Sequence, residues 1–277
     1  MGGGIPQPGG GLLDEGDLVG RRRHTTILLL PLYLARTSES CDATMPKPEE
    51  RSCIASIDPI SFPAETLDPF LFCVYHKDTY PPGDGKLQAP RRGNGADFNP
   101  SAPYRMYHGD RVPGFPQHPH RGFETITATL EGVIDHADSH GNSGRYGGGD
   151  LQWMTAGSGV QHSEMFPLVH TDQPNVCRFF QIWLNLPAAG KFSKPAFVMH
   201  WDEEVPRYSA DGATVTVWAG ELGGKKGLPP PPDSWASKPE SDLAVWHIRL
   251  EPDGVLTIPA AKGGAATNRR AEPRTCS

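Results

Sequence analysis

Apolar and polar residues alternate through the middle of the chain with the period of two that is typical of β-strands. In segment 125–130, threonine alternates with isoleucine, alanine and leucine, as in a strand with two different faces. Segment 151–155 has a strand-like composition, and segment 178–186 (RFFQIWLNL) places four apolar side chains on one face. The glycine-rich segment 147–150 predicts a turn. Because such turns recur at intervals of roughly 8–12 residues, the pattern predicts a β-sandwich or β-barrel.

The last third of the chain continues this pattern more sparsely. Strands are predicted at 213–219, 243–250 and 254–258, so that about four strand candidates follow residue 195. A run of four prolines at 229–232 predicts a stiff connection. Segment 78–103 is rich in Pro, Gly, Asn and Asp, which indicates a long loop. No segment has sustained helical periodicity, so the fold class is predicted to be all-β.

Residues 1–50 are predicted to form an extension outside the fold, either disordered or resembling a targeting signal. The segment begins with the low-complexity sequence MGGGIPQPGGG, and three arginines at 21–23 precede the apolar run 25–35. A basic segment before a short apolar run resembles a signal peptide. The acidic, Gly-rich stretch before the arginines and the lack of a clear cleavage site weaken this interpretation. A translation start at Met45 is an alternative.

Composition excludes some classes of function. The chain has 26 Lys and Arg against 32 Asp and Glu, a net charge of −6, which argues against direct binding of nucleic acid through phosphates. The apolar run 25–35 is too short for a membrane-spanning helix. The five cysteines are odd in number and have no CxxC spacing, so we expect reduced thiols and a cytoplasmic or nuclear location.

Two short motifs carry candidate chemistry. The first runs from Gly114 to Glu124 and contains His118 and His120; the second runs from Met154 to Met165 and contains His162 and Glu164. Side chains two residues apart in a strand point to the same face. If two adjacent strands face one interior, they offer three imidazoles and one carboxylate to a single point.

This set of donors predicts a site for one transition-metal ion. A mixed nitrogen and oxygen set suits iron, manganese, nickel, copper or zinc, and suits calcium poorly. Positions on the metal that the protein leaves open can be taken by water, dioxygen or substrate. His136, His140 and His170 do not share the spacing of the two pairs, and we assign them no role.

Segment 114–167 strongly resembles the pirin family of the cupin superfamily. The resemblance rests on HPHRGFET (118–125), on DLQWMTAG (150–157) and on HSEM (162–165), and weaker similarity extends from about residue 67 to residue 186. It implies a jelly-roll-type cupin β-barrel and a bicupin-like arrangement of two barrels. It also implies Fe(II), or another divalent metal, as the cofactor, held by His118, His120, His162 and Glu164.

Glu124 closes the first motif, where many other cupins have a metal-ligating carboxylate. In the pirin pattern Glu164 takes that role, so we expect Glu124 to orient a ligand histidine from behind. Gly157 and Gly159 are expected to serve a turn with positive φ. The Gly147–Gly149 turn replaces the Pro-Gly-Asp turn expected in the family.

The chain is expected to divide into three parts. Residues 1–50 form the extension, residues 51–190 form the barrel with the metal site, and residues 191–277 form a partial second cupin domain with a disordered tail. A complete second barrel would need roughly eight strands. With about four candidates, the second barrel is predicted to be incomplete.

Three functions fit the resemblance. In the first, the chain is an iron-dependent dioxygenase similar to quercetin 2,3-dioxygenases, with a small aromatic flavonol as substrate and Glu164 as the catalytic proton acceptor. In the second, it is a non-enzymatic, redox-sensing co-regulator whose partner is a protein such as a transcription factor. In the third, it is a barrel whose catalytic function has decayed. Fold analogy alone does not decide whether the chain is an enzyme.

Overall fold

The computed structural model describes residues 63–92, 98, 99 and 101–259, together with the backbone of strand β1 (Thr25–Leu29). The described part is built almost entirely of strands, so the all-β prediction is confirmed. The helical segments of this described part are three short 3-10 turns, η3 (Ala188–Gly190), η4 (Trp235–Ser237) and η5 (Pro239–Ser241). Among the described residues, no helix is long and apolar enough to cross a membrane.

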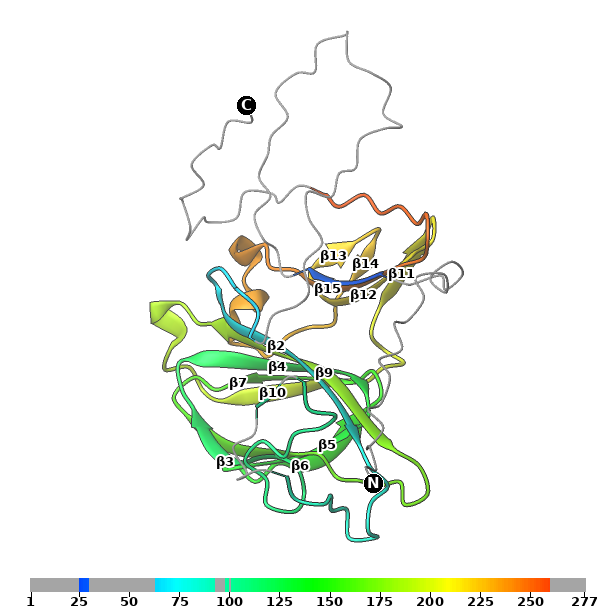
Figure 1. The fold of residues 1–277 in the computed structure, drawn as a ribbon. Coiled ribbons are helices and arrows are strands. Elements are labelled where there is room, and N and C mark those ends of the chain that lie inside the picture. The colour runs from blue at the N-terminus through cyan, green and yellow to red at the C-terminus, as the bar shows by residue number, and fades with distance from the viewer. Residues whose placement is uncertain (1–24, 30–62, 93–97, 100, 260–277) are drawn as a thin grey trace, which may run out of the picture.

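Two sheets face each other and enclose the barrel of the N-terminal unit (Figure 1). The first has the order β10-β7-β4-β9-β2 and the second has the order β3-β8-β5-β6. The first sheet consists of β2 (Phe70–Tyr80), β4 (Phe123–Glu131), β7 (Leu151–Thr155), β9 (Asn175–Asn185) and β10 (Ala196–His200). The second consists of β3 (Gly114–His120), β5 (Val133–Asp138), β6 (Ser143–Gly147) and β8 (Val160–Met165).

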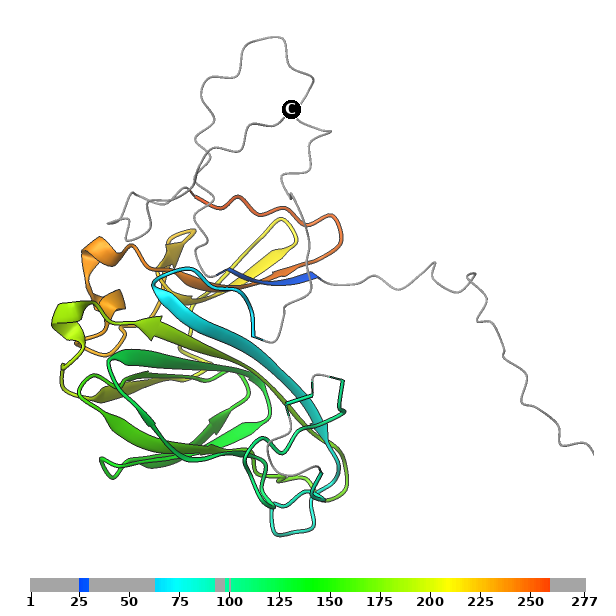
Figure 2. The same cartoon turned by 60° about the vertical axis from the view of Figure 1, so that its left-hand side comes forward.

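A third sheet, with the order β1-β15-β12-β11, lies above the barrel in Figures 1 and 2. It consists of β1, β11 (Arg207–Ala210), β12 (Ala213–Ala219) and β15 (Val245–Leu250), and a hairpin of β13 (Glu221–Leu222) and β14 (Lys225–Lys226) accompanies it. Within the part of the chain that the structure describes, these strands do not close a second barrel. The sequence-based prediction of an incomplete second barrel is therefore confirmed.

Three segments differ from the sequence-based expectation. Residues 196–200, expected in the second cupin domain, form β10 and pair with β7 in the barrel. Residues 25–29, assigned to the extension, form β1 and pair antiparallel with β15; the remainder of residues 1–50 lies outside the described residues. The strand predicted at 254–258 is absent, so that prediction was wrong. A turn closed by the bond from the Gly254 amide to the Glu251 carbonyl precedes this segment, and Asp253 adopts a φ of 63°. After that turn the Val255 amide donates to the carbonyl of Asp211, between β11 and β12, and Leu256 packs against the cluster that contains Val215. The segment therefore lies against the sheet without joining it as a strand.

The sheet containing β4 is buried on both faces. On one face the threonines of β4 point into the barrel, whereas Ile126 and Ala128 on the other face pack in a cluster that reaches the C-terminal unit. This cluster joins Trp153 and Ile182 of the barrel to Trp218 of β12. The alternation seen in the sequence therefore separates two buried environments, and not a buried face from a solvated one.

The interior of the barrel is apolar at one end and polar at the other. The apolar end contains Met106, Tyr107 and Phe179, all buried. A buried ion pair crosses this end, where Arg105 Nε donates to Asp78 Oδ1 over 2.9 Å. Tyr107 donates its hydroxyl to Asp78 Oδ2 over 2.7 Å, and His76 Nδ1 lies 2.7 Å from the same hydroxyl oxygen. The four side chains tie the long loop after β2 to the barrel.

Candidate metal centre

Three histidines meet at the polar end of the barrel. His118 and His120 lie on β3 and His162 lies on β8, directly opposite His118 in the register. Each offers a ring nitrogen, and these atoms all lie within 4.8 Å of one another. The register of β3 shifts between Phe115 and His118, after which the alternation of the strand brings both of its histidines to this point.

Two buried nitrogens of this cluster make no hydrogen bond to the residues that the structure describes. Nε2 of His120 and Nε2 of His162 are both inaccessible to solvent and make no hydrogen bond. Buried polar atoms are nearly always paired, and those that are not require an explanation. A metal ion held where the rings converge would give both atoms a partner. The residues present therefore fit the cofactor that the sequence motifs predict.

The protonation of the imidazoles also suits a metal. Burial lowers the pKa of His120 to about 3, and the adjacent imidazoles of His162 and His118 add to this effect. Burial likewise lowers the pKa of His162 to about 3, followed by the influence of His118 and His136. Both rings are therefore neutral at pH 7, the state in which imidazole binds metals.

His118 is the half-buried member of the cluster, and its tautomer is set by the backbone. Its Nδ1 lies 2.8 Å from the carbonyl oxygen of Pro116. A carbonyl only accepts, so Nδ1 carries the proton and donates it. Nε2 of His118 is then left with its lone pair, as a metal ligand requires.

Glu164, the fourth predicted ligand, lies beside the three imidazoles. Its Oε2 is 3.7 Å from Nε2 of His162, and Thr127 donates its hydroxyl to Oε1 over 3.0 Å. The group of donor atoms within 4.8 Å of one another contains the three histidines and not this carboxylate. The structure thus places all four predicted residues at one end of the barrel, with the histidines closest together.

Aromatic rings border the cluster. The ring of Trp183 lies 5.4 Å from that of His120, and Phe123 packs against both. Nε1 of Trp183 is buried and has no hydrogen-bond partner. Phe115 lies on another side, with its ring 6.2 Å from that of His118. This border of the cluster is therefore aromatic, and its Trp183 N–H makes no hydrogen bond to the described residues.

Glu124 does not orient a ligand histidine, and that prediction was wrong. Its side chain is fully buried on the other face of β4, where Trp153 Nε1 and Thr155 Oγ1 each donate to Oε2 over 2.9 Å. Ser234 Oγ and the backbone N–H of Trp235 donate to Oε1 over 3.1 and 2.9 Å. Glu124 therefore joins the barrel to the C-terminal unit. Glu124 and Thr127 are three residues apart on β4, so their side chains lie on opposite faces, and Thr127 faces Glu164.

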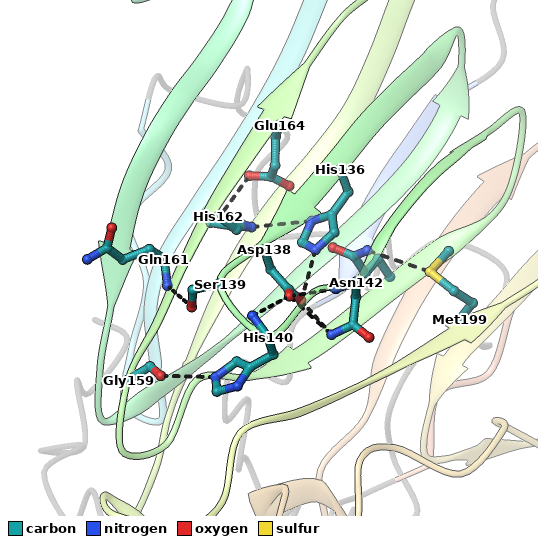
Figure 3. A network of polar contacts seen from close by, with 11 residues as sticks. His136, Asp138, Ser139, His140, Asn142, Gly159, Gln161, His162, Glu164 and Met199 are labelled. Carbon is teal, nitrogen blue, oxygen red and sulfur yellow. Dashed lines mark hydrogen bonds and ion pairs between the residues drawn. The ribbon is translucent and has the colours of Figure 1, made fainter.

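His136, to which the sequence analysis assigned no role, lies against the cluster (Figure 3). Its Nδ1 is 3.5 Å from Nδ1 of His162, and its Nε2 is 3.4 Å from Oδ2 of Asp138. The signal that could have identified it is the spacing His136-x-Asp138, which repeats that of His162-x-Glu164. His140 is exposed on the turn that follows.

Turn geometry near the site agrees with the expectations for glycine. Gly157 and Gly159 have φ values of 48° and 138°. A Cβ at Gly157 would lie 2.2 Å from the carbonyl oxygen of Ser193, so only glycine fits there. The turn at 147–150 is also present, closed by a bond from the Asp150 amide to the Gly147 carbonyl.

Comparison with known proteins gives a consistent family relationship. Residues 64–184 match the family model described as Pirin. A Pseudomonas aeruginosa protein whose name proposes a quercetin 2,3-dioxygenase activity is 35% identical over 170 residues, 61% of this chain and 54% of that protein. Human pirin is 42% identical over 131 residues, 47% of this chain and 43% of human pirin.

One solved structure is similar to part of this chain. The crystal structure of a quercetin 2,3-dioxygenase from Acinetobacter baumannii has a TM-score of 0.46 and 29% identity, covering 59% of this chain and 49% of that one. The chain spans about half, or less, of the length of the curated relatives it matches.

Proposed function

Because residues 64–184 of this chain belong to the pirin family, we propose that the chain is a metal-binding cupin with His118, His120, His162 and Glu164 as ligands. The observation that carries the proposal is the pair of buried, unpartnered Nε2 atoms on His120 and His162. Three nitrogen donors and one oxygen donor favour a first-row transition metal, and we propose Fe(II) first among the divalent metals.

The reaction that this site supports best is a dioxygenation of a flavonol, similar to that of quercetin 2,3-dioxygenases. A bound transition metal with open positions supplies Lewis acidity toward an oxygen donor and access to dioxygen chemistry. The proposal for the substrate rests on the names of two relatives and on the aromatic border of the site. Aromatic side chains favour a flat, apolar ring system.

Glu164 is the proton acceptor in this proposal. Oε1 of the carboxylate accepts a hydrogen bond from the Thr127 hydroxyl. Oε2 lies toward His162, and it is the oxygen that would accept the proton of a flavonol hydroxyl. Thr127 thereby fixes the direction in which Glu164 receives that proton.

Trp183 has a part in binding the substrate. Its unpartnered Nε1–H is a donor next to the ring of His120, and a substrate oxygen entering the site would accept from it. The half-buried His118 marks the side of the cluster that solvent and substrate reach.

The test begins with metal content. We expect about one iron per chain in the purified full chain by elemental analysis, and little in His118→Ala or His162→Ala. His140→Ala, an exposed histidine, is the matched control and should keep its iron. A folded wild-type chain without metal would refute the proposed ligand set and leave the decayed barrel as the better description. Flavonol-dependent oxygen uptake by the iron-loaded chain then tests the reaction.

A second candidate function is an iron-dependent interaction with a protein partner such as a transcription factor. One surface feature favours it. Arg121, next to His120, lies with its guanidinium 4.9 Å from the ring centre of Phe192, a side chain that is 70% exposed. An exposed aromatic that packs on the neighbour in sequence of a proposed ligand offers a contact for a protein partner. Stoichiometric iron without flavonol-dependent oxygen uptake, together with binding of a partner to the ferric form alone, would support this function.

A further inference from the structure

Two His-x-acid segments lie side by side on neighbouring strands. In the antiparallel register of β5 and β8, His136 lies opposite Glu164 and Asp138 lies opposite His162. Figure 3 shows the four side chains beside one another along the paired part of the two strands. One segment supplies two of the proposed ligands, whereas the other has no role in the proposed function. His136 is nevertheless buried, with 4% of its surface exposed.

Asp138 is held firmly in its position. Its Oδ1 accepts from the backbone N–H groups of His140 and Asn142 over 2.8 and 3.1 Å. Asn142 Nδ2 donates to both oxygens, over 3.1 and 2.9 Å. A carboxylate surrounded by donors in this way acts only as an acceptor. Its Oδ2 therefore presents an acceptor to His136 at 3.4 Å.

The order of donors and acceptors along this row follows from Asp138. Because Asp138 accepts, Nε2 of His136 carries the proton, and Nδ1 of His136 keeps its lone pair. That lone pair faces Nδ1 of His162 at 3.5 Å, so Nδ1 of His162 carries the proton of its own ring. Nε2 of His162 is then unprotonated, and this is the buried atom without a partner.

We infer that His136, held by Asp138, is a positioning residue that fixes the tautomer of His162 with Nε2 free to bind a metal. The consequence for metal binding rests on the proposed function, whereas the tautomer itself belongs to the protein without metal. Partners behind a ligand histidine hold its ring and its tautomer, and their loss typically lowers metal affinity about 10–100-fold.

The tautomer is measured directly by long-range ¹H–¹⁵N NMR on the metal-free full chain with labelled histidine. The signal of His162 is assigned by its loss in His162→Gln. We expect wild type to show the Nδ1–H form of His162. His136→Phe keeps the ring volume and removes the acceptor, so we expect the Nδ1–H form to lose its dominance. His136→Asn places a side-chain oxygen near the position of Nδ1 and should preserve it, and His140→Ala should match wild type.

Metal affinity, measured by chelator competition with Fe(II), provides the second readout. His136→Phe should bind about 10–100-fold more weakly, with His136→Asn closer to wild type. An Nε2–H form of His162 in wild type, or an unchanged tautomer and affinity in His136→Phe, would overturn the inference. Should His136→Phe lose its circular dichroism spectrum, Asp138→Ala applies the same test. A wild-type chain with the expected tautomer and no affinity for iron would refute only the proposed metal function.

Discussion

Replacing Glu124 by glutamine tests the connection between the barrel and the C-terminal unit. Each carboxylate oxygen accepts one N–H that cannot turn, from the Trp153 indole or the Trp235 backbone, and one hydroxyl that can. A glutamine amide has one oxygen and one NH₂ group. In either orientation the NH₂ group faces one of the fixed N–H groups, which then has no acceptor.

The expected loss of stability follows from that unpaired group. A buried donor left without a partner costs about 1–3 kcal/mol. Burial raises the pKa of Glu124, against the opposing effect of its four donors, so the neutral amide also avoids part of the cost of burying a charge. The hydroxyls of Thr155 and Ser234 can reorient to accept, but the N–H groups cannot. We therefore expect Glu124→Gln to lower the free energy of unfolding by about 1–3 kcal/mol.

Urea unfolding followed by circular dichroism measures this change. Glu131→Gln, at the end of the same strand and paired with Arg178 at the surface, is the control and should change stability by less than about 0.5 kcal/mol. Iron per folded chain should stay equal to wild type in both variants. Unchanged stability in Glu124→Gln would refute the proposed role of Glu124 in joining the barrel to the C-terminal unit. If that variant lost iron at unchanged stability, Glu124 would instead have a role at the proposed metal centre.

Three further predictions concern pH, the N-terminal strand and the buried ion pair. Burial lowers the pKa of His76, His120 and His162 to about 3, so these imidazoles take up protons at higher pH in the unfolded chain than in the folded one. The urea midpoint of the metal-free protein should therefore fall as pH drops from about 6.5 toward 3. Removing residues 1–44 should leave iron per chain unchanged. The truncation also deletes β1 and leaves the backbone edge of β15 unpaired, so light scattering should report more self-association. Arg105→Met leaves Asp78 buried without its cation and should cost about 3–5 kcal/mol in urea unfolding, against little change for the exposed control Arg145→Met.

The part of the fold that the sequence predicted best is the part whose signals are local. The alternation at 125–130 and the apolar face of 178–186 correspond to β4 and β9, and the glycine turns at 147–150 and 157–159 are present. Period-two patterning records which residues share a face. It does not record what covers each face, and this is why Thr127 was not linked to Glu164 before the structure.

The errors have the same origin. Glu124 and His120 are close in sequence, but β4 turns Glu124 toward Ser234, which is 110 positions away. His136 was assigned no role because it does not share the spacing of the two pairs, although the register of β5 against β8 places it opposite Glu164. Likewise, the apolar run 25–35 resembled a signal segment, and its first five residues pair with β15. Each outcome depends on contacts between distant segments, which no local pattern contains.

The sheet that is buried on both faces has a practical consequence for anyone who dissects this molecule. Cutting the chain after residue 190 would keep every proposed ligand, yet it would strip the cover from Ile126, Trp153 and Ile182. The excised piece would present these side chains to water as a continuous apolar surface, which is a strong drive to aggregate. The barrel and the C-terminal unit share one wall, so the proposed metal centre is best studied, engineered or crystallised with residues 191–250 still attached.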